Sequence, residues 1–191
     1  VESAWNPLYI VPLGVDRYLR SWGIPAQRIR TLAWWDTTAL PDAELEVTFV
    51  PAQHWSQRTP FDRNQSLWGG FVIRASGQTA YFAGDTGYFD GFVEIGRRFG
   101  DIDIAMIPIG AYDPEWFMSP QHIGPEDAVR ALTEVRGQRM LPIHWGTYKL
   151  TDEPLDEPPQ RLERWRLQQG LSTSAVSAIP VGGRLLLDGA A

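Results

Sequence analysis

The chain has 191 residues, of which 43% are hydrophobic and 21% charged, and this is the composition of one globular domain with a sizeable core. Its formal net charge of −6, without a cluster of lysine and arginine, excludes nucleic acid as a partner because nothing would neutralise the phosphates. There is no cysteine, so disulfides and thiolate metal sites are excluded, and any metal must be held by histidine, aspartate or glutamate.

The first predicted elements form a strand-helix-strand unit. Residues 8–13 are a short apolar run that predicts a strand, and residues 15–22 carry apolar side chains at helical spacing. Gly23 and Pro25 end this helix, and a second strand is expected at residues 28–32. Such a unit is typical of the layered α/β class, which we predict for the chain.

The middle of the chain predicts an antiparallel meander. Residues 44–50 alternate between polar and apolar side chains, as in a half-buried strand. A polar loop at residues 56–66 separates this strand from two more, at residues 67–75 and 79–83. Because these strands follow one another closely along the chain, we expect sequence neighbours to pair antiparallel.

The rest of the chain alternates helices with strands. Apolar side chains of residues 89–99 share one helical face, and Pro125 begins a second helix that runs to about residue 135. The nearly continuous apolar run at residues 102–107 predicts a strand covered on both faces, and residues 140–143 predict the next strand. The remaining predictions are a loop at 110–123, an acidic proline-rich loop at 151–159, a helix at 162–169 and an edge strand at 184–187.

Candidate metal ligands stand next to the ends of the predicted strands. His54, Asp85 and His144 each follow a predicted strand, and the third histidine of the chain, His122, lies in the aromatic loop. Strand ends of one sheet can meet at one edge of that sheet, where α/β folds place their chemistry. A set of histidines and one carboxylate, without cysteine, is typical of a site for zinc or a similar divalent metal.

Each of these residues also has a structural interpretation. Asp85 lies between Gly84 and Gly87 in a turn where it would bond only its own backbone. A histidine beside a tryptophan in a loop is more often packed or hydrogen-bonded than a metal ligand. His54 and His144 nevertheless lie in the same short sequence motif, His-Trp followed by a small residue, and in both cases the motif follows an apolar strand. This coincidence favours the metal-site hypothesis.

Several short sequence motifs resemble those of one protein family and occur in the same order along the chain. They are Pro51-Ala52-Gln53-His54-Trp55, Ala83-Gly84-Asp85-Thr86-Gly87-Tyr88, Pro108-Ile109-Gly110-Ala111-Tyr112, Gln121-His122 and Ile143-His144-Trp145-Gly146-Thr147. They resemble the metallo-β-lactamase superfamily, and in particular its branch related to N-acylphosphatidylethanolamine-hydrolysing phospholipase D. The resemblance implies an αββα sandwich with two zinc ions at one edge, of which residues 1–191 are a single partial domain, the C-terminal half.

The resemblance also implies roles for the candidate ligands. His54 resembles a ligand of the first metal, Asp85 the carboxylate that bridges both metals, and His144 the last histidine of the second metal. Asp85 and His122 are therefore expected to be catalytic. Gln121 and His122 are expected to bind the substrate phosphate or to support the ligands.

The aromatic loop is expected to bind the rest of the substrate. In the complete protein, we expect Tyr112 and Trp116 of this loop to line an apolar entrance for acyl chains. The alternative is that this loop simply packs over the core.

The family signature H-x-H-x-D-H is absent from the chain. We therefore expect the first half of the sandwich to lie upstream in a longer protein or in a separate partner chain. Alone, the chain is expected to bind zinc weakly and to hydrolyse little. Its apolar face, left open by the missing half, would favour association with other chains, including copies of itself.

The resemblance predicts a zinc-dependent phosphodiesterase once the domain is complete, in which hydroxide activated by the metals attacks phosphorus. The substrate would be a phospholipid or another phosphodiester or ester. The alternatives are another hydrolase of the same fold acting on a lactone or a small phosphoester, and a binding or scaffold module without activity. No apolar run has membrane-spanning length, so a cytoplasmic chain that contacts a membrane at its surface is expected.

Overall fold

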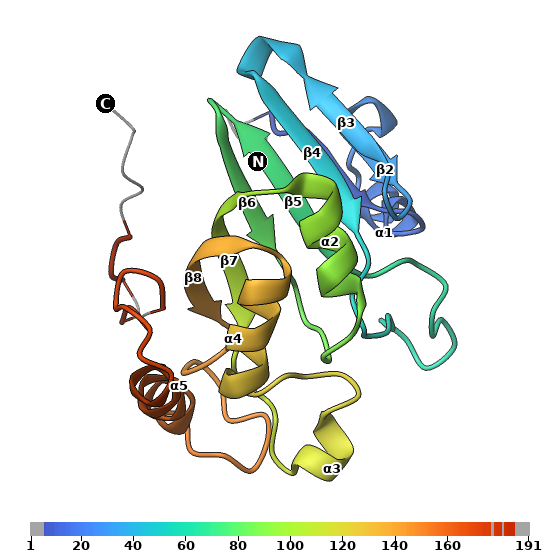
Figure 1. The fold of residues 1–191 in the computed structure, drawn as a ribbon. Coiled ribbons are helices and arrows are strands. Elements are labelled where there is room, and N and C mark those ends of the chain that lie inside the picture. Colours follow the sequence, from blue (N-terminus) through green and yellow to red (C-terminus); the bar gives the residue numbers. More distant parts are fainter. Residues whose placement is uncertain (1–5, 177, 181, 186–191) are drawn as a thin grey trace.

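The computed structural model describes residues 6–176, 178–180 and 182–185 (Figure 1). Two short 3₁₀ helices lie at Ala26–Arg28 and Pro41–Ala43. The other elements, in chain order, are β1 (Tyr9–Pro12), α1 (Asp16–Ser21), β2 (Ile29–Leu32), β3 (Thr37–Leu40), β4 (Leu45–Val50), β5 (Gly70–Ala75), β6 (Gln78–Phe82), α2 (Gly91–Phe99), β7 (Ile102–Pro108), α3 (Glu115–Met118), α4 (Pro125–Glu134), β8 (Gly137–Ile143) and α5 (Glu157–Gln168).

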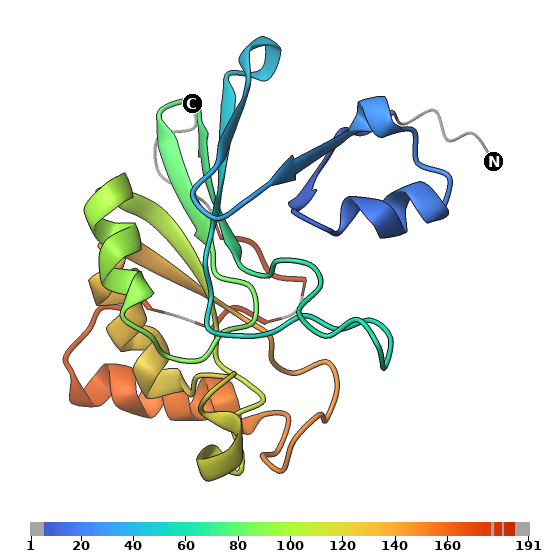
Figure 2. The same cartoon turned by 90° about the vertical axis from the view of Figure 1, so that its right-hand side faces the viewer.

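A six-stranded sheet in the order β3-β4-β5-β6-β7-β8 forms the centre of the molecule. Strands β3 to β6 pair antiparallel, whereas β6, β7 and β8 run parallel. Helices α2, α4 and α5 lie on one face of this sheet, and the unit formed by β1, α1 and β2 lies on the other side (Figure 2). The predicted α/β class, the meander and the strand-helix-strand unit, whose two strands pair parallel, are confirmed.

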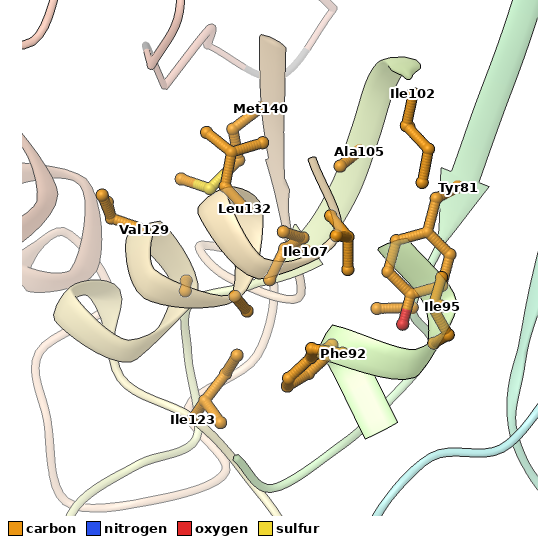
Figure 3. Packing of buried hydrophobic residues seen from close by; sticks show 14 of the residues in the cluster. Tyr81, Phe92, Ile95, Ile102, Ala105, Ile107, Ile123, Val129, Leu132 and Met140 are labelled. Atoms are coloured by element: carbon orange, nitrogen blue, oxygen red, sulfur yellow. The ribbon is translucent and has the colours of Figure 1, made fainter. Parts of the chain in front are cut away.

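The hydrophobic core fills the space between the sheet and its helices. Tyr81 of β6 contributes to one buried cluster with Phe92 of α2 and Leu132 of α4 (Figure 3). The two helices approach closely because Gly96 has no side chain: a Cβ there would lie 2.2 Å from the carbonyl oxygen of Glu134. Burying this apolar face of each helix supplies the main driving force for the arrangement.

The elements that the sequence did not predict, or placed differently, depend on tertiary contacts. Strand β3 is short and takes its extended form by pairing with β4, with Thr37 opposite Thr48. Helix α5 begins at Glu157, inside the predicted proline-rich loop, because prolines in a first helical turn lose no hydrogen bond. Helix α3 interrupts the predicted loop at 110–123. Of the predicted edge strand at 184–187, the first two residues are not in a strand and the rest lie outside the described residues.

The sheet face opposite α2 carries a row of large apolar side chains. Phe49, Phe71 and Phe82 lie opposite one another across β4, β5 and β6. Phe82 adjoins Tyr81 and therefore points away from the helices, since side chains alternate along a strand. Phe49 is fully buried, but Phe82 remains 38% exposed. This face is therefore apolar and incompletely covered within the described part of the chain.

One core hydroxyl generates a stability prediction. Tyr81 is fully buried, its hydroxyl has no hydrogen-bond partner among the described residues, and burial raises the pKa of this phenol. Replacing Tyr81 by phenylalanine removes an unsatisfied polar group at almost constant shape. We expect Tyr81→Phe to raise the free energy of unfolding by about 1 kcal/mol, measured by urea denaturation.

Tyr88 provides the matched control for this measurement. Its hydroxyl donates a hydrogen bond to Glu134, so Tyr88→Phe should lower the free energy of unfolding by about 1 kcal/mol. A clear loss of stability in Tyr81→Phe would show that the Tyr81 hydroxyl is satisfied, for example by a buried water.

Candidate metal centre

The sheet places several strand ends at one edge. Strand β4 is antiparallel to β5, and β5 is antiparallel to β6, so β4 and β6 point the same way. Strands β7 and β8 continue in that direction because they pair parallel with β6 and with each other. The segments that follow β4, β6 and β8 carry His54, Asp85 and His144, so the topology brings these three residues to the same edge.

The structure gathers the three histidines and Asp85 into one cluster. His144 Nε2 lies 3.4 Å from Asp85 Oδ1. The imidazole centroids of His122 and His144 are 5.3 Å apart, and those of His54 and His122 are 5.2 Å apart. All four predicted residues therefore meet, although His122 comes from a loop and not from a strand end.

The environment shifts the pKa values of His122 and His144 in opposite directions. Burial, with smaller contributions from the other two histidines, lowers the pKa of His122 to about 4, so this ring is neutral at pH 7. The hydrogen bond to Asp85 raises the pKa of His144, and the same bond lowers the pKa of Asp85. Asp85 thus favours the protonated form of His144, whereas His122 presents an uncharged ring.

The donor atoms are of the kinds that a divalent metal requires. His54 Nδ1 lies 2.9 Å from the carbonyl oxygen of Trp55, an acceptor, so this nitrogen carries the proton and Nε2 is free to bind a metal. His122 Nδ1 is buried and has no hydrogen-bond partner in the described structure. Within the described residues, however, no three histidine, aspartate or glutamate side chains are placed so that they could hold an ion by themselves. The donor set fits a metal in kind, but the described residues do not complete a site.

The turn after β7 and the turn after β8 are fixed to one another. Ala111 (φ 63°) and His144 (φ 58°) both adopt the left-handed conformation, which is costly for residues with a side chain. Gly110 allows their close approach, because a Cβ there would lie 2.3 Å from the carbonyl oxygen of His144. The backbone that presents His144 is therefore strained, and contacts around it must hold it in place.

Glu153 holds the turn after β7, which lies against His144. This carboxylate is 7% exposed and accepts hydrogen bonds from the backbone N–H of Ala111 (2.6 Å) and of Asp113 (3.2 Å). Burial acts to raise the pKa of Glu153, but hydrogen bonds from the Thr151 side chain and the backbone hold it below its usual value. The sequence placed Glu153 in a loop and did not reveal this role, because its partners are backbone groups of a distant segment.

The two aromatic residues predicted to bind substrate lie in different surroundings. Tyr112 is buried, its hydroxyl donates to Glu157 (2.8 Å), and it borders a pocket of about 360 Å³ together with His122. Trp116 of α3 is 82% exposed. The structure therefore places Tyr112 beside the cluster but anchored to α5, and does not bring Trp116 to it. Both assignments remain predictions.

A second pocket opens directly onto the cluster. It has a volume of about 390 Å³, and both His54 and Asp85 line it. Its other walls include Tyr18 of α1 and the indole rings of Trp55 and Trp68. The sequence did not predict this pocket, since its walls come from several separate segments between residues 12 and 85 that only the fold brings together.

A protein-family model described as the beta-lactamase superfamily domain matches residues 2–145. Among curated proteins, an uncharacterized protein of Mycobacterium tuberculosis is 43% identical over 157 residues, which is 81% of this chain and 41% of that protein. The mitochondrial N-acyl-phosphatidylethanolamine-hydrolyzing phospholipase D of Saccharomyces cerevisiae is 38% identical over 163 residues, 83% of this chain and 34% of that protein.

The corresponding phospholipase D 1 of Caenorhabditis elegans is 39% identical over 162 residues, 81% of this chain and 46% of that protein. The chain thus spans less than half the length of these relatives. Among solved structures, the metallo hydrolase Igni18 of Ignicoccus hospitalis aligns with a TM-score of 0.65 and 23% identity, over 90% of this chain and 65% of that one. This likeness shows the fold.

The role of Glu153 leads to a stability prediction. The variant Glu153→Gln keeps the shape of the side chain but replaces one acceptor oxygen by an amide and removes the charge. We expect the free energy of unfolding to fall by about 2 kcal/mol, measured by urea denaturation at pH 7. The exposed neighbour Asp152 provides the control, and a loss no larger than that of Asp152→Asn would contradict the assignment.

The lowered pKa of Glu153 predicts how this contribution depends on pH. A carboxylate whose pKa is depressed in the folded state stabilises the fold above its unfolded pKa of about 4.3, and this contribution is lost as the pH falls through that value and lower. The difference in unfolding free energy between the wild type and Glu153→Gln should therefore be full at neutral pH and shrink in acid. A difference that grew on acidification would refute the prediction.

Proposed function

This chain belongs to the metallo-β-lactamase superfamily, and we propose that the complete protein is a zinc-dependent hydrolase that cleaves a phosphodiester of the N-acylphosphatidylethanolamine type. The superfamily assignment and the metal-dependent hydrolases among its relatives support a metal-dependent hydrolase. The yeast and nematode relatives, which are named for N-acyl-phosphatidylethanolamine hydrolysis, support the substrate class.

The observation that carries the proposal is the cluster of three imidazoles and one carboxylate at the carboxyl ends of the strands. His54, Asp85 and His144 would hold the metal, and Asp85 has the two oxygens needed to contact two ions. A bound divalent metal supplies Lewis acidity toward a phosphoryl oxygen and lowers the pKa of water. Ligands beyond those of the described residues come from other parts of the complete protein or from a partner chain.

The chain's own residues bind and orient the substrate. Gln121 can donate its amide N–H groups to phosphoryl oxygens. His122, neutral at pH 7, carries one ring N–H, which can donate to a phosphoryl oxygen or to a neighbouring ligand. The pocket lined by His54 and Asp85 gives the substrate a route to the cluster from the side of α1.

A membrane surface is the proposed source of the substrate. Trp116 and Phe117 of α3 are 82% and 61% exposed, and such aromatic side chains partition favourably into a lipid–water interface. Among the described residues, no helix is both long and apolar enough to cross a membrane. The proposed membrane interaction is contact of α3 with the surface of the membrane.

Substitution of Asp85 tests the metal role. In the full-length protein, Asp85→Asn removes the negative charge but keeps the shape, so metal content and activity should fall together. Metal content is measured by elemental analysis and hydrolysis with a phosphodiester substrate. Asp90 is the matched control, because it is exposed and its side chain forms no capping hydrogen bond at the start of α2. Full activity of Asp85→Asn would refute the bridging role.

Titration of the isolated chain with zinc tests whether the described residues make an incomplete site. Isothermal titration calorimetry should show weak binding or none, since two four-coordinate zinc sites need more ligands than this cluster supplies. Tight binding of two equivalents would overturn the prediction.

A substrate panel separates the proposed reaction from the alternatives. Relative kcat/KM of the full-length protein on an N-acylated phospholipid, a water-soluble phosphodiester and a lactone should favour the phospholipid. Preference for the lactone would contradict the proposal, and failure on all three by metal-loaded protein would support a binding module.

A further inference from the structure

The contact between Trp55 and Gln121 fixes the orientation of an amide beside the cluster. Trp55 Nε1 donates a hydrogen bond to Gln121 Oε1 at 3.1 Å. An indole N–H can only donate, so the amide atom facing it must be the oxygen. The usual ambiguity between the oxygen and nitrogen of a glutamine amide is therefore resolved here by chemistry.

The segment that carries Gln121 is held a second time. Gln53 Nε2 donates to the carbonyl oxygen of Pro120 (3.0 Å), while the backbone N–H of Gln53 donates to Thr86 Oγ1 (3.0 Å). Side chains on either side of His54 thus fasten the backbone and the side chain of the segment leading to His122. The Trp55 ring also stacks on the His54 imidazole, with centroids 5.6 Å apart and an interplanar angle of 9°.

The amide nitrogen of Gln121 has no such partner. Among the described residues, the hydrogen bond from Trp55 engages its oxygen, and its NH₂ group donates to none of them. With its oxygen engaged by Trp55, the amide offers the two N–H groups as its free donors, and such donors recognise a hydrogen-bond acceptor, such as a non-bridging phosphoryl oxygen.

We propose that Trp55 is a positioning residue for substrate specificity. Its indole N–H holds the amide oxygen of Gln121, so that the amide N–H donors face the substrate. This inference rests on the proposed function for the identity of the acceptor, a phosphodiester. It differs from a packing role for Trp55. Packing would need only a large ring at this position, whereas orienting the Gln121 amide needs the indole N–H.

A double-mutant cycle in the full-length, metal-loaded protein tests whether the Trp55 hydrogen bond orients the Gln121 amide. Trp55→Phe keeps the ring that stacks on His54 but removes the donor, and Gln121→Ala removes the amide. Each variant should raise KM for the phosphodiester about tenfold, with little change in kcat, as expected for one hydrogen bond. The double variant should be no worse than Gln121→Ala alone, because without the amide there is nothing to orient.

Gln121→Glu provides a sharper variant. The carboxylate still accepts the indole hydrogen bond, but it places a charged acceptor where the N–H donors were. Its KM should rise about a hundredfold. Trp34→Phe is the matched control: it also loses an indole hydrogen bond, to the carbonyl oxygen of Trp68 (2.7 Å), and it should leave KM unchanged.

Calorimetric binding of inorganic phosphate to the same proteins gives a readout independent of turnover. Phosphate affinity should fall in Trp55→Phe and Gln121→Glu but not in Trp34→Phe. Unchanged affinity and KM in Trp55→Phe, or strictly additive effects in the double variant, would overturn the inference. If phosphate affinity changes among the variants as expected but the wild type hydrolyses no phosphodiester, the proposed function is refuted, whereas the orienting role of Trp55 is supported.

Discussion

The direction of the strands is the constraint on which the site depends. Because β6, β7 and β8 pair parallel and β4 points the same way, the segments that leave these strands meet at one edge of the sheet. Had β8 run antiparallel, His144 would lie at the opposite edge from Asp85. Helices α2 and α4 make the parallel pairing possible, since they lie in the connections from β6 to β7 and from β7 to β8 and cover one face of the sheet (Figure 1).

Burial gives chemically identical side chains different properties. His122 loses solvent without gaining a hydrogen-bond partner for Nδ1, and its imidazole is kept neutral. His144 loses solvent too, but it gains the carboxylate of Asp85, which favours the charged ring. The cluster therefore contains two imidazoles whose pKa values are shifted in opposite directions, although they belong to the same residue type.

The loops that carry the site are held by side chains that take no direct part in it. The buried carboxylate of Glu153 binds the turn after β7, and the neighbours of His54 fasten the segment before His122. The bond from the Ala111 N–H to Glu153 helps to hold the left-handed backbone at Ala111. Residues far apart in sequence thus fix the cluster, which explains how loops can present side chains with the precision that binding requires.

The sequence by itself revealed the motifs that resemble the family, most strands and helices, and the four residues of the cluster. Apolar periodicity and the positions of glycine and proline are local signals, and they were enough to identify the meander, α2, α4 and the ends of β4, β6 and β8. Only the tertiary structure decided what depends on contacts between distant segments. Strand β3 exists through its pairing with β4, Tyr112 is turned toward Glu157, and Glu153 and Trp55 acquire partners 42 and 66 positions away. Hydrogen-bond partners, burial and charge state belong to the folded chain, because each is set by neighbours that the sequence does not place side by side.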